Sequence, residues 1–218
     1  MTPRICVSIL PKTEAEALQL IEKAEATHAD FIEVRLDHLE NQNGLADLAT
    51  HGKTPKIATD KASRKETEHH QMLIAAAKSG FEYVDTELST PQLGDLVKEL
   101  KELDVKPIVS FHKFDGSLNI SELNGILERE ISTGAEVCKI VTTAKQMEDN
   151  LTTLNFTSAA SRKAKVVCFC MGELGKVSRL LSPLFGGFFT FASLESGSET
   201  ASGQITIQEM KASYELLG

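Results

Sequence analysis

Eight short runs of β-branched and apolar residues recur along the 218-residue chain, and this repeat limits the possible folds more than any other feature. The runs begin 23 to 30 residues apart, about the length of one strand and one helix. In chain order they are ICVSIL (5–10), FIEVRL (31–36), KIATD (56–60), YVDTEL (83–88), KPIVSFH (106–112), EVCKIVTT (136–143), KVVCFCM (165–171) and FFTFASL (188–194). Strands that alternate with helices predict a parallel sheet.

The segments between these runs follow the helical period, with apolar residues three and four positions apart. The clearest stripes are Leu93, Leu96, Val97 and Leu100, then Leu123, Ile126, Leu127 and Ile131, and a narrower one of Ala17, Ile21 and Ala24. We expect Thr13 and Ser121 to cap helix starts, and Gly80 and Gly134 to end helices before the next strand.

The eight units occupy the whole chain and favour a single-domain (β/α)8 TIM barrel over residues 1–218. Such a barrel needs at least about 200 residues, so this one would carry little decoration. An open doubly wound sheet is the alternative, but the chain has no GxGxxG motif or P-loop to support it. No linker or change in composition indicates a second domain.

The net charge of −8 argues against a nucleic-acid or anionic-membrane partner, since both require a basic face. No apolar run approaches the ~18 residues of a membrane span, and the N-terminal run is too short for a signal peptide. Cys6, Cys138, Cys168 and Cys170 lie in apolar runs without metal-ligand spacing. We therefore expect free buried thiols and a cytoplasmic protein.

Several ionisable or polar residues lie on strand faces that should point into the barrel, where apolar side chains are the rule. They are Glu33 and Arg35, Asp85 and Glu87, Ser110 and His112, and Lys139. Each alone has an ordinary explanation, such as a buried ion pair, a solvated histidine at a strand end or a lysine that reaches solvent. Together they predict a paired polar cluster inside the barrel, because burying an unpaired charge costs several kcal/mol.

The types of residue in this cluster indicate imine chemistry. Among apolar strand residues, the amine of Lys139 should lose solvation, so its pKa should fall and part of it should be neutral near pH 7. A neutral amine attacks a ketone to form an imine, which acts as an electron sink. His112 could then remove a proton from the adjacent carbon and return it to a leaving hydroxyl, with Glu87 fixing the imidazole tautomer. This chemistry requires neither metal nor cofactor.

At these residues the sequence resembles the type I 3-dehydroquinate dehydratases, which form an imine in the shikimate pathway of aromatic amino acid biosynthesis. The likeness spans nearly the whole chain and is carried by EVRLDH (33–38), VDTEL (84–88), IVSFH (108–112), CKIV (138–141), SRL (178–180) and GQI (203–205). The resemblance implies a syn elimination of water from 3-dehydroquinate to give 3-dehydroshikimate, without cofactor. It also implies a homodimer.

The resemblance assigns roles by position. Lys139 would form the Schiff base, His112 would be the general base and acid, and Glu87 would orient it. The substrate-binding residues would be Glu33, Arg35, Lys61, Arg179, Thr200 and Gln204. Arg179 would bind the carboxylate, and residues 195–204 would form a mobile lid.

The sequence departs from the family pattern at several positions. Lys61 stands where the family has an arginine on the third strand, and Thr200 stands where it usually has serine. Lys113 follows the catalytic histidine in place of aspartate or asparagine, and Ser202 replaces a proline. These changes bear on the third-strand contact and on the lid, but not on Lys139.

Two other functions are compatible with the same barrel. A class I aldolase would also use a lysine imine, but aldolase substrates are mostly phosphorylated. Residues 171–175 (MGELG) contain two glycines where phosphate would bind, and also the anionic Glu173. A non-catalytic scaffold would have no need to keep both Lys139 and His112, because neither is required for packing.

Overall fold

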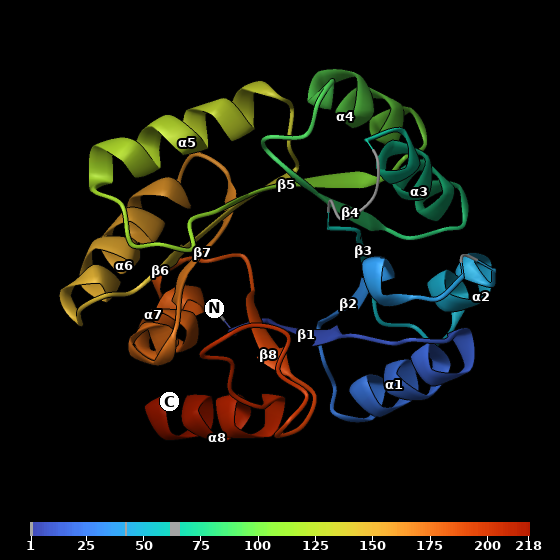
Figure 1. Ribbon diagram of the computed structural model, residues 1–218. Helices are drawn as coiled ribbons and strands as arrows, with labels where there is room; N and C mark the ends of the chain where they lie inside the picture. Colours follow the sequence, from blue (N-terminus) through green and yellow to red (C-terminus); the bar gives the residue numbers. More distant parts are fainter. Residues whose placement is uncertain (1, 42, 62–65) are drawn as a thin grey trace.

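The computed structural model describes residues 2–41, 43–61 and 66–218, which form alternating strands and helices (Figure 1). The strands are β1 (Ile5–Ile9), β2 (Phe31–Arg35), β3 (Lys56–Thr59), β4 (Tyr83–Glu87), β5 (Lys106–His112), β6 (Val137–Thr143), β7 (Lys165–Met171) and β8 (Thr190–Ser193). The helices are α1 (Glu14–Ala26), α2 (Leu45–Thr50), α3 (Glu66–Lys78), α4 (Leu93–Glu102), α5 (Ile120–Ser132), α6 (Glu148–Ala160), α7 (Lys176–Leu181) and α8 (Ile207–Leu217). Short 3-10 turns are η1 (Leu36–His38), η2 (Glu173–Gly175) and η3 (Ser182–Phe185).

The strands form one parallel sheet in the order β7-β6-β5-β4-β3-β2-β1-β8. β8 pairs with β1, and the sheet curls until β7 and β8 come together, with the helices around the outside (Figure 1). Phe188 N donates to Val166 O at 2.7 Å across this junction. The predicted barrel is therefore confirmed, and the open doubly wound sheet is wrong.

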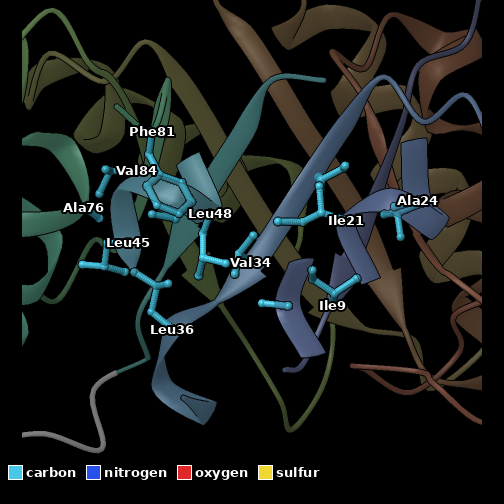
Figure 2. Packing of buried hydrophobic residues seen from close by; sticks show 14 of the residues in the cluster. Ile9, Ile21, Ala24, Val34, Leu36, Leu45, Leu48, Ala76, Phe81 and Val84 are labelled. Atoms are coloured by element: carbon cyan, nitrogen blue, oxygen red, sulfur yellow. The ribbon is translucent and has the colours of Figure 1, made fainter. Parts of the chain in front are cut away.

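An outer core lies between the strands and the helices. Figure 2 shows β-strand side chains such as Ile9 and Val34 packed against Ile21 of α1 and Leu48 of α2. The Ile21 and Ala24 side chains of the expected α1 stripe are fully buried here. This layer attaches the helices to the outside of the barrel.

A second core lies inside the barrel, and part of it fills the amino-terminal half. It includes Phe31, Ile57, Tyr83, Ile108 and Phe189, which come from neighbouring positions around the barrel. Because these side chains close the amino end, the interior is left open for polar groups only toward the carboxyl ends of the strands. The polar members of the same inward faces lie at that end.

The helix boundaries confirm three of the four expected capping positions. Thr13 caps α1, and Gly80 and Gly134 have φ values of +102° and +85° after α3 and α5. The expectation for Ser121 is wrong, because Asn119 caps α5 instead. The Asn119 side chain accepts from the backbone N of residue 122 at 3.0 Å, and the Glu122 carboxylate accepts from Asn119 N at 2.9 Å.

The buried stripe of α5 also differs from the prediction at one position. Leu123, Ile126 and Leu127 are buried as expected, but Ile131 is 40% exposed and Glu130 is fully buried. Position 130 is seven residues after 123 and completes the i, i+3, i+4, i+7 stripe, whereas position 131 has rotated past the core. The helical geometry therefore places a carboxyl group inside the protein.

The four cysteines are free and buried, as expected. Among the described residues, no helix is both long enough and apolar enough to cross a bilayer.

Candidate active site

A cavity of about 570 Å³ opens at the carboxyl ends of the strands. All nine residues that the sequence predicted for the site line it: Glu33, Arg35, Lys61, Glu87, His112, Lys139, Arg179, Thr200 and Gln204. Its apolar wall includes Phe169, Met171 and Phe191. The fold thus brings together side chains from β2, β4, β5 and β6 and from the segments after β3, β7 and β8.

Lys139 lies at the floor of this cavity, and its residue is only 4% exposed. Its Nζ donates to Asp85 Oδ2 at 2.6 Å and lies 3.7 Å from Glu33 Oε1. The ammonium also lies over the Phe191 ring, 4.3 Å from its centroid. Lys139 is therefore the centre of a buried cluster with two carboxylates and one aromatic face.

The predicted fall in the pKa of Lys139 is wrong for the free protein. Burial by itself lowers this pKa, but the negative charges of Asp85 and Glu33 outweigh burial, so the pKa is raised from its ordinary value. Desolvation was expected from the apolar strand, but the carboxylate partners come from other strands. Lys139 is an ammonium when the free protein is at neutral pH.

Glu33 is held by hydroxyl groups from the strands on either side. Ser8 Oγ of β1 and Thr59 Oγ1 of β3 donate to its two carboxylate oxygens, the second at 2.9 Å. Arg35, two residues along the same face, makes a two-point contact with Asp37 at 2.9 and 2.7 Å. The strand-two motif therefore presents one fixed carboxylate and one fixed guanidinium to the cavity.

His112, Glu87 and Lys61 form a chain along one side of the cavity. Lys61 Nζ donates to Glu87 Oε1 at 2.6 Å, and His112 Nδ1 lies 2.7 Å from the same oxygen, close but poorly aligned for a hydrogen bond. Burial would raise the pKa of Glu87, but its contacts with His112 and Lys61 lower it. The carboxylate is therefore ionised and can hold the Nδ1–H tautomer of His112, which leaves Nε2 to accept a proton.

The pKa of His112 is lowered chiefly by burial, and the positive charge of Lys61 adds to this effect. Contact with Glu87 opposes the shift but does not cancel it. His112 is thus neutral, and able to act as a base, at a lower pH than an exposed histidine.

Arg179, from α7, is buried to 1% exposure. Its guanidinium lies over the Phe169 ring, 4.3 Å from the centroid, and one Nη donates to Ser202 O at 3.3 Å. Its Nε has no hydrogen-bond partner, and no carboxylate among the described residues forms an ion pair with it. Burial lowers the pKa of Arg179 to about 9, which leaves it charged at neutral pH.

The segment after β8 covers the side of the cavity next to Arg179. The side-chain amide of Gln204 donates to Thr200 Oγ1 at 3.0 Å, and Gln204 Oε1 accepts from Thr200 N at 2.7 Å. Gly203 has φ +76°, and a Cβ there would lie 2.2 Å from the carbonyl oxygen of Gly172. Only glycine therefore allows this loop to pack against the end of β7. That the loop opens and closes stays a prediction.

The sequence interpretation placed Asp85 and Ser110 on inward faces but gave them no role. In the structure Ser110 Oγ donates to Asp85 Oδ1 at 2.7 Å, so both oxygens of Asp85 are used within the cluster. Asp85 and Glu87 are two residues apart on β4 and therefore share a face. This spacing is the sequence signal that could have placed Asp85 in the site. Phe114, Phe169 and Phe191 also line the cavity, and nothing in their sequence pattern distinguished them from core residues.

Within the ranges that the structure describes, no group of three His, Cys, Asp or Glu side chains is arranged to hold a metal ion. The cavity instead combines a buried amine, an imidazole paired with a carboxylate, and a buried guanidinium. This arrangement suits covalent and acid–base chemistry on a small anionic carbonyl compound.

Comparison with known proteins agrees with this reading of the cavity. The family model for type I 3-dehydroquinase matches residues 5–218. A 3-dehydroquinate dehydratase of Dehalococcoides mccartyi is 36% identical over 97% of this chain and 95% of its own length. One from Coxiella burnetii is 34% identical over 98% and 93%.

Solved structures give the same result. The 3-dehydroquinate dehydratase of Geobacillus kaustophilus superposes with a TM-score of 0.90 at 27% identity, covering 100% of this chain and 91% of that one. The chain is also similar to an aldolase named QR15, with a TM-score of 0.61 at 15% identity over 99% and 96% of the two chains. The latter likeness shows the barrel fold alone.

Proposed function

This chain belongs to the type I 3-dehydroquinase family, and we propose that Lys139, His112 and Arg179 carry out the reaction at its active site. The activity is that of a 3-dehydroquinate dehydratase, a hydro-lyase of aromatic biosynthesis.

The observation that carries the proposal is the buried Arg179, whose guanidinium has one hydrogen bond to a carbonyl and no ion pair among the described residues. A buried charge without an ion pair costs several kcal/mol of stability unless a ligand supplies the opposite charge. The carboxylate of 3-dehydroquinate fits this requirement, because a guanidinium binds a carboxylate at two points. Arg179 then sets the direction in which the substrate enters.

Lys139 forms the covalent bond. Its ammonium first gives up a proton, which the departing carbonyl oxygen later takes up, and the amine nitrogen attacks the ketone carbon of the substrate. The carbonyl oxygen leaves as water, and a protonated imine on Nζ is the product. The reaction of an ammonium with a ketone to give an iminium and water leaves the total charge unchanged.

His112 then acts as base and acid. Its neutral Nε2 takes a proton from the carbon next to the imine, and the electron pair of that C–H bond moves to the imine nitrogen to give a neutral enamine. The imidazolium returns the proton to the departing hydroxyl, which leaves as water while the iminium is restored. Hydrolysis of this iminium releases the product and regenerates Lys139. Glu87 orients the ring.

The remaining predicted residues position the substrate. Glu33 and Arg35 face the cavity from β2 and suit hydroxyl groups, and Lys61 adds a positive charge from the end of β3. Thr200 and Gln204 belong to the loop beside Arg179 and would lie over the bound substrate. These contacts act on orientation rather than on bond breaking.

Reduction with borohydride in the presence of 3-dehydroquinate tests the proposal. We expect a mass increase on the protein that maps to Lys139 after proteolysis. An adduct on another lysine would refute the assigned role of Lys139, and trapping only of a phosphorylated aldol donor would favour an aldolase.

We also propose that the protein is cytoplasmic and forms a homodimer. Free buried cysteines suit a reducing compartment, and the dimer is implied by the family resemblance. Light scattering coupled to size exclusion would give the mass of the assembly, and a mass near that of one chain would refute the dimer.

A further inference from the structure

Asp85 is the carboxylate nearest to the reacting nitrogen, and none of the steps above uses it. Its side chain is 0% exposed, and Oδ2 lies 2.6 Å from Lys139 Nζ. Ser110 Oγ donates to the other oxygen at 2.7 Å. Burial by itself would raise the pKa of Asp85, but the charge of Lys139 outweighs it and holds the pKa well below its ordinary value.

Glu33 is the other carboxylate near Nζ, but its position is different. Glu33 Oε1 lies 3.7 Å from Nζ and also accepts the Thr59 hydroxyl, while its second oxygen accepts Ser8. Asp85 therefore makes the direct hydrogen bond to the amine, and Glu33 contributes at longer range. Only one of the two carboxylates is placed as an immediate counter-ion.

The charge on the nitrogen explains why such a counter-ion matters. Imine formation replaces the ammonium of Lys139 by an iminium on the same Nζ atom, and each carries one positive charge. A positive charge this deeply buried is stable only beside a negative one. The carboxylate that pairs with the ammonium is already in place for the iminium, so the charge pair persists through bond formation.

We infer that Asp85 is a catalytic residue of this enzyme, the counter-ion that keeps the Lys139 imine protonated. This inference rests on the proposed function, since it requires an imine on Lys139. A protonated imine accepts the electron pair of the adjacent C–H bond, whereas a neutral imine is a poor acceptor. Asp85 would therefore act on the steps after imine formation, and Ser110 would hold it in position.

Two reducing reagents distinguish the protonation states of the imine. Borohydride reduces both forms, whereas cyanoborohydride reduces the protonated form and spares the neutral one. In both cases hydride adds to the imine carbon and leaves a stable secondary amine on Lys139. The ratio of the cyanoborohydride adduct to the borohydride adduct, measured by intact mass with 3-dehydroquinate present, reports the protonated fraction.

The test variant is Asp85→Asn, which keeps the shape of the side chain and removes its charge. We expect its ratio to fall at least tenfold below the wild-type ratio at the same mildly alkaline pH, while the borohydride adduct on Lys139 remains. Ser110→Ala is the matched control, because it removes a hydrogen bond to the other oxygen of the same carboxylate and keeps the negative charge. Its ratio should stay within about threefold of the wild type, the size of a small change in geometry.

The possible results separate the inference from the proposed function. Equal trapping of Asp85→Asn by both reagents would overturn the counter-ion, as would a folded variant that gives no adduct, because Asp85 would then act in forming the imine. An equal fall in both variants would also overturn it, since charge would not be the cause. Absence of any Lys139 adduct in the wild type would instead refute the proposed function.

A measurement on the wild type alone covers the case in which Asp85→Asn does not fold. With the counter-ion in place, the wild-type ratio should be flat up to about pH 9, because a neighbouring carboxylate raises the pKa of the iminium. A ratio that falls with pH already below about pH 8 would overturn the inference.

Discussion

Replacing Arg179 should make the free protein more stable and the enzyme nearly inactive. The guanidinium is buried, stacks on Phe169 and has one hydrogen bond to a carbonyl, but no ion pair among the described residues. Arg179→Met keeps a long side chain that packs on an aromatic ring and removes the buried charge.

The size of both effects follows from these contacts. Removing a poorly compensated buried charge should stabilise by about 1–4 kcal/mol, and losing the bond to Ser202 O should cost about 0.5–1.5 kcal/mol. A net gain of up to about 3 kcal/mol in the free energy of unfolding is expected. The lost two-point contact with the substrate carboxylate is worth about 3–6 kcal/mol, so kcat/KM should fall by about 10²–10⁴-fold.

Urea unfolding and steady-state kinetics on the same preparations measure the two effects. Arg162→Met is the matched control, because Arg162 is exposed and outside the cavity, and it should change neither quantity. Arg179→Lys keeps a charge but not the planar fork, and should raise KM strongly. A variant Arg179→Met that keeps kcat/KM within threefold, or that loses more than about 1 kcal/mol of stability, would refute the reasoning.

Four other changes test the rest of the site. Lys139→Met should abolish dehydration and, by leaving Asp85 unpaired, lower stability at neutral pH by about 3–5 kcal/mol. The wild type should lose this advantage in stability as the pH falls toward the low pKa of Asp85. Turnover by Lys139→Met above about a tenth of the wild-type rate would exclude the imine. His112→Ala should accumulate the imine, so borohydride should trap more adduct on Lys139 than in wild type under turnover; no adduct would place His112 in imine formation. Lys61→Ala should weaken substrate binding by about 1–3 kcal/mol, which appears as a higher KM. Because Lys61 lowers the pKa of His112, the same change should shift the acidic limb of the pH–rate profile to higher pH. Unchanged KM, kcat and pH profile would contradict both effects. Glu130→Gln should stabilise the protein above about pH 5, because burial raises the pKa of Glu130 to about 10, so an acid that is ionised in the unfolded chain must take up a proton to fold. Equal stability of the two proteins from acid to alkaline pH in denaturant titrations would show that burying Glu130 has no such cost.

The strand and helix pattern was predictable because its causes are local. Each strand run carries the β-branched and apolar residues that suit a sheet, and Thr13 caps α1 through a contact only three residues away. The misplaced cap at Ser121 arose among competing local signals, since Asn119 makes both bonds of a capping box with Glu122. The positions of strands and helices can therefore be predicted from nearby residues, and an error such as the α5 cap shifts a boundary by one or two residues.

The residues that line the cavity from the strands were also predictable, because alternation along a strand assigns each side chain to a face. Glu33, Glu87, His112 and Lys139 all line the cavity as expected. What those side chains do to each other was not predictable. The Lys139 strand is apolar, so the sequence indicated a lowered pKa, but the partners that raise it come from β2 and β4.

The eight strand–helix units, the inward polar faces and the family of the protein can all be read from the amino-acid sequence. The charge state of Lys139, the lack of an ion pair for Arg179 among the described residues and the shared oxygen of Glu87 become visible only in the folded barrel. Periodicity depends on neighbours along the chain, whereas electrostatic energy depends on distance in space. Asp85 and Lys139 are 54 residues apart in sequence and 2.6 Å apart in the barrel.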